Sequence, residues 1–435
     1  MSDLHDLCRF AERPITSKYV DQLNFYLRSG IPATYTIEEA YNYTNDIAAE
    51  PTTTTTPLHL ICTHVPENAT AEELKVVDTM VQTLFEYGAG WCLSDVNNDT
   101  PGCILIKRKL NHLNIYTQIV DSGVRAELLL RKVGEFDMEI IEDTDDLDHD
   151  RFGEVPELVE EKAEQIEQPK SDEKPDPEES NKSVEIVDAS DAADAPDAPS
   201  QNQQSYLNTK LEYVDNALIT KDRKDGVMMA WETDLMRLGC ESLFKGSIIE
   251  DNEEDSEINI LNIGFGMGII DTMINEKNPT KHYICEAHPD VLAKLKADGW
   301  YEKKNVVILE GRWQEQLDKL LSSGEVYFNG IYYDTFSEHY SDMLELFDYV
   351  VGLLKPYGVF SFFNGLGADR QVVYEVYKKL SELDLANYGL QCTFTSVEVP
   401  KETLQENDKS VWDDVKRSYW SCPVYYHPEA RFIDL

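Results

Sequence analysis

The chain has 435 residues and a formal net charge of −43, with 82 Asp and Glu against 39 Lys and Arg, and 42% of its residues are hydrophobic. At about 100 to 200 residues per domain this length predicts two or three domains, and the apolar content excludes a wholly disordered chain. Because so negative a surface repels phosphates and anionic lipid head groups, we expect a basic protein partner, with no direct nucleic-acid binding and no membrane.

The cysteines and the apolar stretches indicate the compartment. The eight cysteines include no C-x-x-C pair and no Cys/His cluster of zinc-ligand spacing, so we expect reduced thiols and no metal. The N-terminus lacks the basic and apolar regions of a signal peptide. The most apolar stretch, residues 260–270, is far shorter than the ~20 residues that cross a bilayer. We expect a soluble protein of the cytosol or the nucleus.

Helical segments that end at a glycine recur in the first third of the chain, at residues 23–32, 81–90 and 116–125. Glycine favours the left-handed conformation of a helix C-cap. TTPLHLIC (55–62) resembles the turn that opens an ankyrin repeat, with His59 as a structural turn residue, and NDTPGCIL (98–105) is a degenerate copy. We therefore expect an all-α, ankyrin-like domain over residues 1–133. It would bind a protein partner, and the rest of the chain would fold without it.

Residues 134–204 carry a large share of the charge. Between Glu135 and Ser200 there are 25 Asp and Glu but 5 Lys and Arg, a net −20. Few large apolar residues interrupt this run, so burial cannot offset the ordering entropy and we expect a disordered acidic linker. It serves either as a self-repelling spacer, which we favour, or as an acidic segment that attracts a basic protein.

Beyond residue 205 the pattern changes to alternating strands and helices. Strands are predicted at residues 258–264, 282–287, 305–311, 328–336, 358–364, 393–399 and 419–426. Helical patterns separate the first five, which is typical of a mostly parallel, doubly wound α/β sheet. No clear helix separates the last two, which predicts an antiparallel pair. Seven strands in this arrangement suit a class I methyltransferase fold over residues 205–435.

A glycine-rich turn, LNIGFGMGII (261–270), joins the first of these strands to a helix. Gly264, Gly266 and Gly268 allow the backbone to approach a ligand closely. Glu286 follows 22 residues after Gly264, at the end of the next strand, where a carboxylate can accept both ribose hydroxyls of an adenosine. A dinucleotide site shares both features, so these residues alone leave NAD and other adenosine cofactors open.

Two carboxylates add to this site. Asp334 comes at the carboxyl end of the fourth strand, an edge that faces the ligand crevice of a doubly wound sheet. Glu232, in the segment GVMMAWETDLM (226–236), can approach from the helix that precedes the glycine-rich turn. Two anions in one pocket suit a planar cation, and guanidinium is the obvious match because it forms bidentate, charge-assisted hydrogen bonds.

Four segments in this order and spacing resemble guanidinoacetate N-methyltransferase and the fungal type IV protein arginine methyltransferases: VMMAWETDLM (227–236), NIGFGMGI (262–269), EGRWQE (310–315) and YYDTF (332–336). The resemblance covers residues 205–435, and an ankyrin-like region with an acidic linker ahead of them is the fungal layout. It implies S-adenosyl-L-methionine (SAM) as cofactor and monomethylation of an arginine δ-nitrogen in a protein, with a large-subunit ribosomal protein as the expected target. Glu232 and Asp334 would grip the guanidinium as catalytic residues.

The resemblance also implies the cofactor contacts. Glu286 would hold the ribose, and Trp313 with Gln314 would pack on the adenine. The full set that we expect is Tyr206, Met228, Met236, Gly264, Phe265, Gly266, Met267, Gly268, Ile269, Ile270, Glu286, Ala287, His288, Trp313, Gln314 and Asp334.

Three other interpretations remain open at this point. The chain could methylate a small guanidino compound, or it could be an ankyrin-type scaffold with an inactive methyltransferase fold. Transfer to a terminal ω-nitrogen is the closest chemical alternative, although we find no close pair of glutamates like the one in ω-type enzymes. The sequence decides neither the nitrogen nor which carboxylate accepts the proton.

Overall fold

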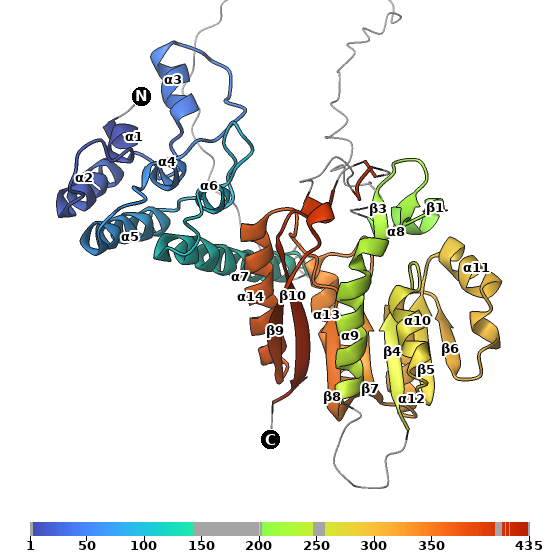
Figure 1. Ribbon diagram of the computed structural model, residues 1–435. Helices are drawn as coiled ribbons and strands as arrows, with labels where there is room; N and C mark the ends of the chain where they lie inside the picture. Colours follow the sequence, from blue (N-terminus) through green and yellow to red (C-terminus); the bar gives the residue numbers. More distant parts are fainter. Residues whose placement is uncertain are drawn as a thin grey trace, which may run out of the picture. The chain divides into compact units, whose positions relative to one another are not determined.

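A computed structural model describes residues 3–142, 200, 202–246, 257–404, 411–413, 415–416 and 418–433 (Figure 1). Most of the predicted acidic linker, residues 134–204, lies outside them. The described parts of Met1–Ala126 and Ala195–Leu435 form one compact unit. Within the described ranges, no helix is both long and apolar enough to cross a membrane, and no cluster of His, Cys, Asp and Glu could hold a metal ion.

The first part of the chain is all helical (blue to teal in Figure 1). The helices are α1 (Asp3–Leu7), α2 (Ser17–Arg28), α3 (Ile37–Thr44), α4 (Pro57–His64), α5 (Ala71–Glu86), α6 (Pro101–Lys107) and α7 (Asn114–Glu142). Threonine precedes five of them, and the side chains of Thr36 and Thr70 accept hydrogen bonds from the third helical N–H. These N-caps explain where the helices begin. Ankyrin repeats stay a prediction.

His59 has the structural role expected of it. Its Nδ1 accepts a hydrogen bond from the Thr56 N–H (3.2 Å), so Nε2 carries the proton and donates to the carbonyls of Leu93 (3.0 Å) and Asp99 (3.2 Å). The fully buried imidazole therefore ties the start of α4 to the loop before α6.

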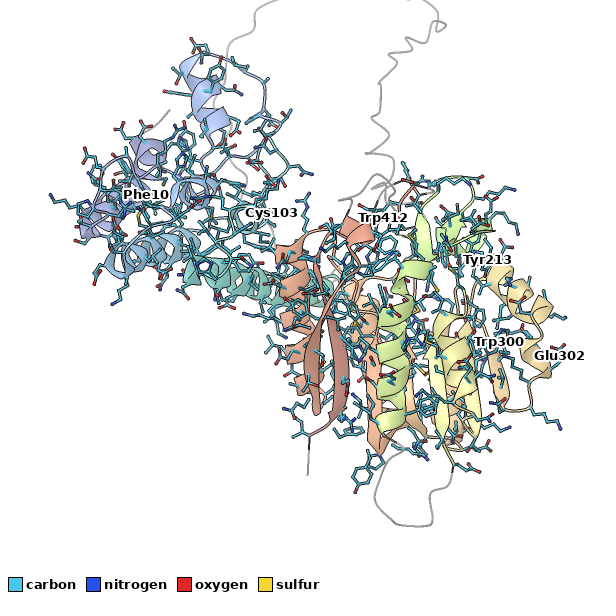
Figure 2. All side chains as sticks on the ribbon, in the orientation of Figure 1. Phe10, Cys103, Tyr213, Trp300, Glu302 and Trp412 are labelled. Carbon is cyan, nitrogen blue, oxygen red and sulfur yellow. The ribbon has the colours of Figure 1, made fainter. Side chains whose placement is uncertain are left out.

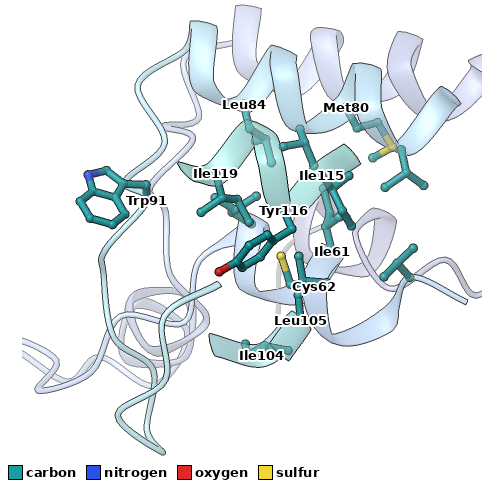
Figure 3. Close-up of a cluster of buried hydrophobic side chains, with 14 of the residues drawn as sticks. Ile61, Cys62, Met80, Leu84, Trp91, Ile104, Leu105, Ile115, Tyr116 and Ile119 are labelled. Carbon is teal, nitrogen blue, oxygen red and sulfur yellow. The ribbon is translucent and has the colours of Figure 1, made fainter. Parts of the chain in front are cut away.

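The third predicted helix end, at Gly123, is wrong, because α7 continues through it to Glu142. A Cβ on Gly123 would lie 2.6 Å from Val376 Cγ2, and one on Gly102 would lie 2.6 Å from Val372 Cγ2. These glycines therefore permit close helix packing rather than a turn. Figure 3 shows the cluster of buried side chains to which this part of the chain contributes, with Trp91 at its edge.

Helix α14 (Gln371–Asn387) supplies the other side of that contact. Val372, Val376 and Leu380 recur every four residues on one face of α14, are fully buried, and belong to the same core cluster as the side chains of α4 to α7. An ion pair between Lys379 Nζ and Asp121 Oδ1 (2.7 Å) lies beside them. The helical region is therefore packed onto the α/β part through a continuous apolar face.

Seven strands form the main sheet, in the order β6-β5-β4-β7-β8-β10-β9. They are β4 (Asn259–Ile263), β5 (Lys281–Glu286), β6 (Val306–Glu310), β7 (Phe328–Tyr333), β8 (Leu354–Phe362), β9 (Leu390–Glu398) and β10 (Val424–Phe432). The pairs from β6 to β8 are parallel, and β10 is antiparallel to β8 and to β9. This confirms the predicted class I methyltransferase fold.

Helices cover both faces of this sheet. They are α9 (Thr233–Lys245), α10 (Ile269–Glu276), α11 (Pro289–Ala297), α12 (Trp313–Ser323), α13 (Tyr340–Leu353) and α14, with short 3-10 turns η2 (Ala230–Glu232), η3 (Trp300–Glu302) and η4 (Lys401–Leu404). Successive residues of β4 point to opposite faces: Ile260 packs in the core under α9 and α10, and Leu261 in the core under α12 and α13. Figure 1 shows α9 and α10 in front of the sheet.

Two expectations differ from the structure. Residues 226–236 are not one helix: they form strand β3 (Gly226–Met229), the turn η2 and the start of α9, because β3 pairs with β2 (Ala217–Thr220) in a small sheet with β1 (Leu211–Val214). The last strand begins at Val424 rather than at residue 419, since Trp420 and Cys422 are buried in a separate core cluster.

Candidate active site

The glycine-rich turn connects β4 to α10. Gly264 adopts φ +93°, a left-handed conformation that L-residues with a Cβ rarely adopt. A Cβ at this position would lie 1.8 Å from the carbonyl oxygen of Asp334. The Asp334 N–H in turn donates to the carbonyl of Ile263 (2.9 Å), the residue before the turn. The two loops that carry the predicted site are therefore in direct backbone contact.

Glu286 ends β5 beside this turn and is buried. Its carboxylate accepts hydrogen bonds from the N–H groups of Phe265 (2.9 Å), Ala287 (2.8 Å) and His288 (2.7 Å). Burial raises the pKa of Glu286, and these backbone donors oppose the shift. These donors fix the orientation of the carboxylate beside the turn and leave about one lone-pair site free for a ligand hydroxyl.

A cavity of about 590 Å³ opens above the turn, and we call it the glycine-turn cavity. Of the residues expected to contact the cofactor, those that line it are Tyr206, Met228, Gly264, Gly266, Glu286, Ala287, Trp313 and Asp334. The remaining ones, which do not line it, are Met236, Phe265, Met267, Gly268, Ile269, Ile270, His288 and Gln314. The predicted set is therefore only partly gathered around one cavity.

Several residues that do not line the cavity support it. The Phe265 ring packs edge-on against Trp300 (5.4 Å between ring centroids), and Met236 and Ile270 are buried in the core between α9, α10 and the sheet. His288 Nε2 hydrogen bonds to the carbonyl of Tyr206 (3.1 Å). His288 thereby holds helix α8 (Gln203–Asn208), which contributes three residues to the cavity wall.

A second cavity, of about 1110 Å³, adjoins the first, and we call it the carboxylate cavity. Glu232 and Asp334 both line it, so the structure brings together the two predicted catalytic residues. The residues common to both cavities are Val227, Asp334, Thr335, Phe336 and Glu338. A group bound in one cavity is therefore separated from a group in the other cavity only by this shared wall.

The two carboxyl groups are poorly suited to carry charge without a cation beside them. Burial and the nearby Asp334 charge raise the pKa of Glu232 well above its usual value. Burial, and then the charge of Asp271, raises the pKa of Asp334 to about 7. Asp334 Oδ2 is buried and has no hydrogen-bond partner among the described residues. A guanidinium would supply both the missing charge and the missing donors.

Comparison with known proteins decides the family. The model of guanidinoacetate N-methyltransferase matches residues 204–408. Protein arginine N-methyltransferase 2 of Debaryomyces hansenii is 68% identical over 441 residues, covering 100% of both chains. The protein of that name from Saccharomyces cerevisiae is 49% identical over 447 residues, covering 99% of this chain and 100% of its own.

The chain belongs to the protein arginine N-methyltransferase 2 family. It is thus a SAM-dependent arginine N-methyltransferase, as the sequence predicts, and the scaffold alternative is set aside. Among solved structures, the chain is similar to the O-methyltransferase TomG from Streptomyces achromogenes, at 15% identity and a TM-score of 0.31 over 48% of this chain and 82% of that one. So weak a similarity carries no argument about function.

The glycine-turn cavity of this methyltransferase suits SAM. The turn at Gly264 provides a side-chain-free backbone, Glu286 has acceptor capacity for a ribose hydroxyl, and Trp313 offers a buried aromatic ring for the base. We therefore expect Glu286 to hold the ribose, Trp313 to pack on the adenine and Met228 to cover the methionine end.

Two functional candidates of the methyltransferase were missed in the sequence. Tyr419 lines the carboxylate cavity and donates a hydrogen bond to Glu232 Oε1. Its ring packs against Trp412, labelled in Figure 2, at 4.8 Å between ring centroids. Glu338 lies in the shared wall, four residues after Asp334. Its place on the loop at a strand's carboxyl end could have indicated it, whereas nothing local indicates Tyr419.

The raised pKa of Asp334 predicts the pH dependence of the methyltransferase. In the free enzyme Asp334 is protonated below its pKa of about 7, and a neutral carboxyl pairs poorly with a guanidinium. We expect kcat/KM for an arginine peptide to fall about tenfold for each pH unit below 7. A pH–rate profile tests this; a wild-type profile that stays flat from about pH 6 to 8 would contradict it.

Proposed function

We propose that this methyltransferase monomethylates the δ-nitrogen of an arginine in a basic protein, the nitrogen that is bonded to Cδ of the side chain. The observation that carries the proposal is the pair of carboxyl groups, Glu232 and Asp334, in one cavity that shares a wall with the predicted cofactor site. Two carboxylates can pair with the two terminal nitrogens of a guanidinium, which leaves the third nitrogen for the methyl group.

The residues of the carboxylate cavity have distinct tasks in this proposal. A guanidinium is protonated at neutral pH, because its pKa lies above ~12, and its nitrogens are poor nucleophiles. Tyr419 fixes one oxygen of Glu232 by a hydrogen bond. Asp334, anchored through its backbone N–H, bonds the guanidinium from the side of the cofactor cavity. Together they hold the group so that the δ-nitrogen faces that cavity.

The methyl transfer requires one proton to leave the substrate. Bound SAM supplies a methyl group on a positively charged sulfur, an excellent leaving group. As the new N–C bond forms, the δ-nitrogen gives up its N–H proton, and Glu232 or Asp334 accepts it. The raised pKa values of both carboxyl groups make them suitable bases near neutral pH.

The target and the location are further parts of the proposal. A large-subunit ribosomal protein is the target that the family resemblance suggests, and its basic surface would suit a chain with a net charge of −43. We propose a monomeric enzyme of the cytoplasm and nucleus on the same resemblance, with ankyrin-like repeats that contact the target.

The deciding experiment identifies the methylated nitrogen. Proteins from a cell extract lacking this enzyme are incubated with the purified chain and methyl-labelled SAM, hydrolysed, and compared with methylarginine standards. We expect label in δ-N-methylarginine. Label in an ω-N-methylarginine would refute the choice of nitrogen. Faster methylation of free guanidinoacetate than of protein would refute the choice of substrate.

A further inference from the structure

Glu338 accepts an unusual number of hydrogen bonds for one side chain. Its Oε1 accepts from Gln203 Nε2 (2.6 Å) and Trp313 Nε1 (2.8 Å). Its Oε2 accepts from Thr335 Oγ1 (2.7 Å) and from the Tyr333 hydroxyl. A carboxylate has about four lone-pair sites, so these donors use all of its capacity. They come from α8, α12, β7 and the loop that carries Asp334, so one side chain joins four parts of the site.

The backbone before Glu338 is held in an unfavourable conformation. Ser337 adopts φ +65°, in the left-handed region that a residue with a Cβ seldom occupies. Such a conformation persists only where the surroundings impose it. Here the surroundings are the four donors that bond the next side chain, which points into the wall shared by the two cavities.

Helix α8 depends on such contacts for its position. It has only six residues, too few for a helix to be stable by itself. Gln203, Tyr206 and Leu207 from α8 line the glycine-turn cavity. The Tyr206 ring packs on Phe336 at 4.9 Å between ring centroids. Gln203, at the start of α8, extends this attachment to the Glu338 carboxylate, and His288 bonds the carbonyl that follows the other end of α8.

We propose that Glu338 is a positioning residue for cofactor binding, which latches α8 over the glycine-turn cavity and fixes the Trp313 ring in the cavity wall. Glu338 acts through Gln203 and Trp313 and does not touch the reacting atoms. The inference rests on SAM-dependent methyl transfer, which the family establishes, and is independent of which guanidine nitrogen accepts the methyl group.

The test measures binding of S-adenosylhomocysteine to the full-length protein by calorimetry. We expect Glu338→Ala to raise the Kd by about tenfold or more, as loss of hydrogen bonds to a charged group does. Glu338→Gln retains an acceptor for Gln203 and Trp313 and should lie between Glu338→Ala and wild type. Gln203→Ala removes only the α8 attachment and should raise the Kd about threefold, through faster release.

The matched control is Gln316→Ala. Gln316 lies on the same helix as Trp313 and donates to the Glu310 carbonyl (2.8 Å), but it lines neither cavity, so its Kd should equal that of wild type. Hydrogen exchange of the α8 amides, with S-adenosylhomocysteine bound, should be faster in Glu338→Ala and Gln203→Ala and unchanged in Gln316→Ala.

Three results would overturn the proposal. One is a Glu338→Ala protein that melts at the wild-type temperature and binds S-adenosylhomocysteine with the wild-type Kd. The second is a Gln203→Ala protein with wild-type Kd and wild-type protection of α8. The third is a Glu338→Gln protein as weak as Glu338→Ala, because a latch needs the acceptor that Gln retains. If Glu338→Ala does not fold, Gln203→Ala decides the question alone.

Discussion

Asp334→Asn is expected to lower kcat by about a thousandfold with a protein or peptide acceptor, the range seen when a charged acid–base group is lost. Asparagine has nearly the same shape and keeps the backbone hydrogen bond to Ile263. It cannot neutralise a guanidinium or accept the proton. Because Asp334 contributes to the glycine-turn cavity only through the shared wall, the Kd for S-adenosylhomocysteine should change less than about fivefold.

Single-turnover rates at saturating cofactor and calorimetry on the same preparation separate these two effects. Asp369→Asn serves as the control, since Asp369 is an exposed acid that lines neither cavity, and its kcat should match wild type. An Asp334→Asn enzyme with near wild-type turnover would rule out the carboxylate pair as the acceptor site.

A fragment of residues 195–435, without the helical region, is expected not to fold as a stable monomer. The sequence suggests a self-sufficient catalytic domain, but Val372, Val376 and Leu380 of α14 are buried in the core of the helical region. Burying one such side chain contributes about 1.5–3 kcal/mol. Exposing three approaches the total stability of a typical protein, about 5–15 kcal/mol.

Thermal unfolding and gel filtration of the fragment test this expectation. We expect aggregation, or a broad transition well below that of the full chain. Val376→Gln with Leu380→Gln should make the fragment more soluble and the full chain less stable, since the same surface is exposed in one and buried in the other. A cooperative fragment with the full chain's affinity for S-adenosylhomocysteine would show that the helical region is separable.

The sequence predicted those parts of the fold that local patterns determine. The continuous apolar strands and the glycine turn lie where expected because periodicity and glycine conformation are properties of a few neighbouring residues. The small sheet of β1 to β3 was missed, since its strands have four residues each and β1 is only half-buried. The role of Gly123 was misinterpreted because the residue that leaves no room for a side chain there, Val376, lies 253 residues further along the chain.

The candidate site divides in the same way. Asp334 and Glu286 follow from their places at strand ends, which face a ligand crevice in any doubly wound sheet. Glu232 was expected in the site, but not on a short turn after a strand. Tyr419 contributes to the site from beyond the region that the family model matches, and Gln203 contributes from a six-residue helix. Only tertiary packing assembles such contacts.

The contact between Gly264 and the carbonyl of Asp334 limits how the enzyme can be redesigned. Any side chain at position 264 would push against the backbone that carries an acceptor carboxylate, so library mutagenesis of the cofactor turn would change acceptor selectivity and cofactor preference together. Attempts to direct the enzyme to other guanidino compounds should therefore vary residues that line the carboxylate cavity but not the glycine-turn cavity, such as Met343, Phe363 and Leu366, and leave both loops at this contact untouched.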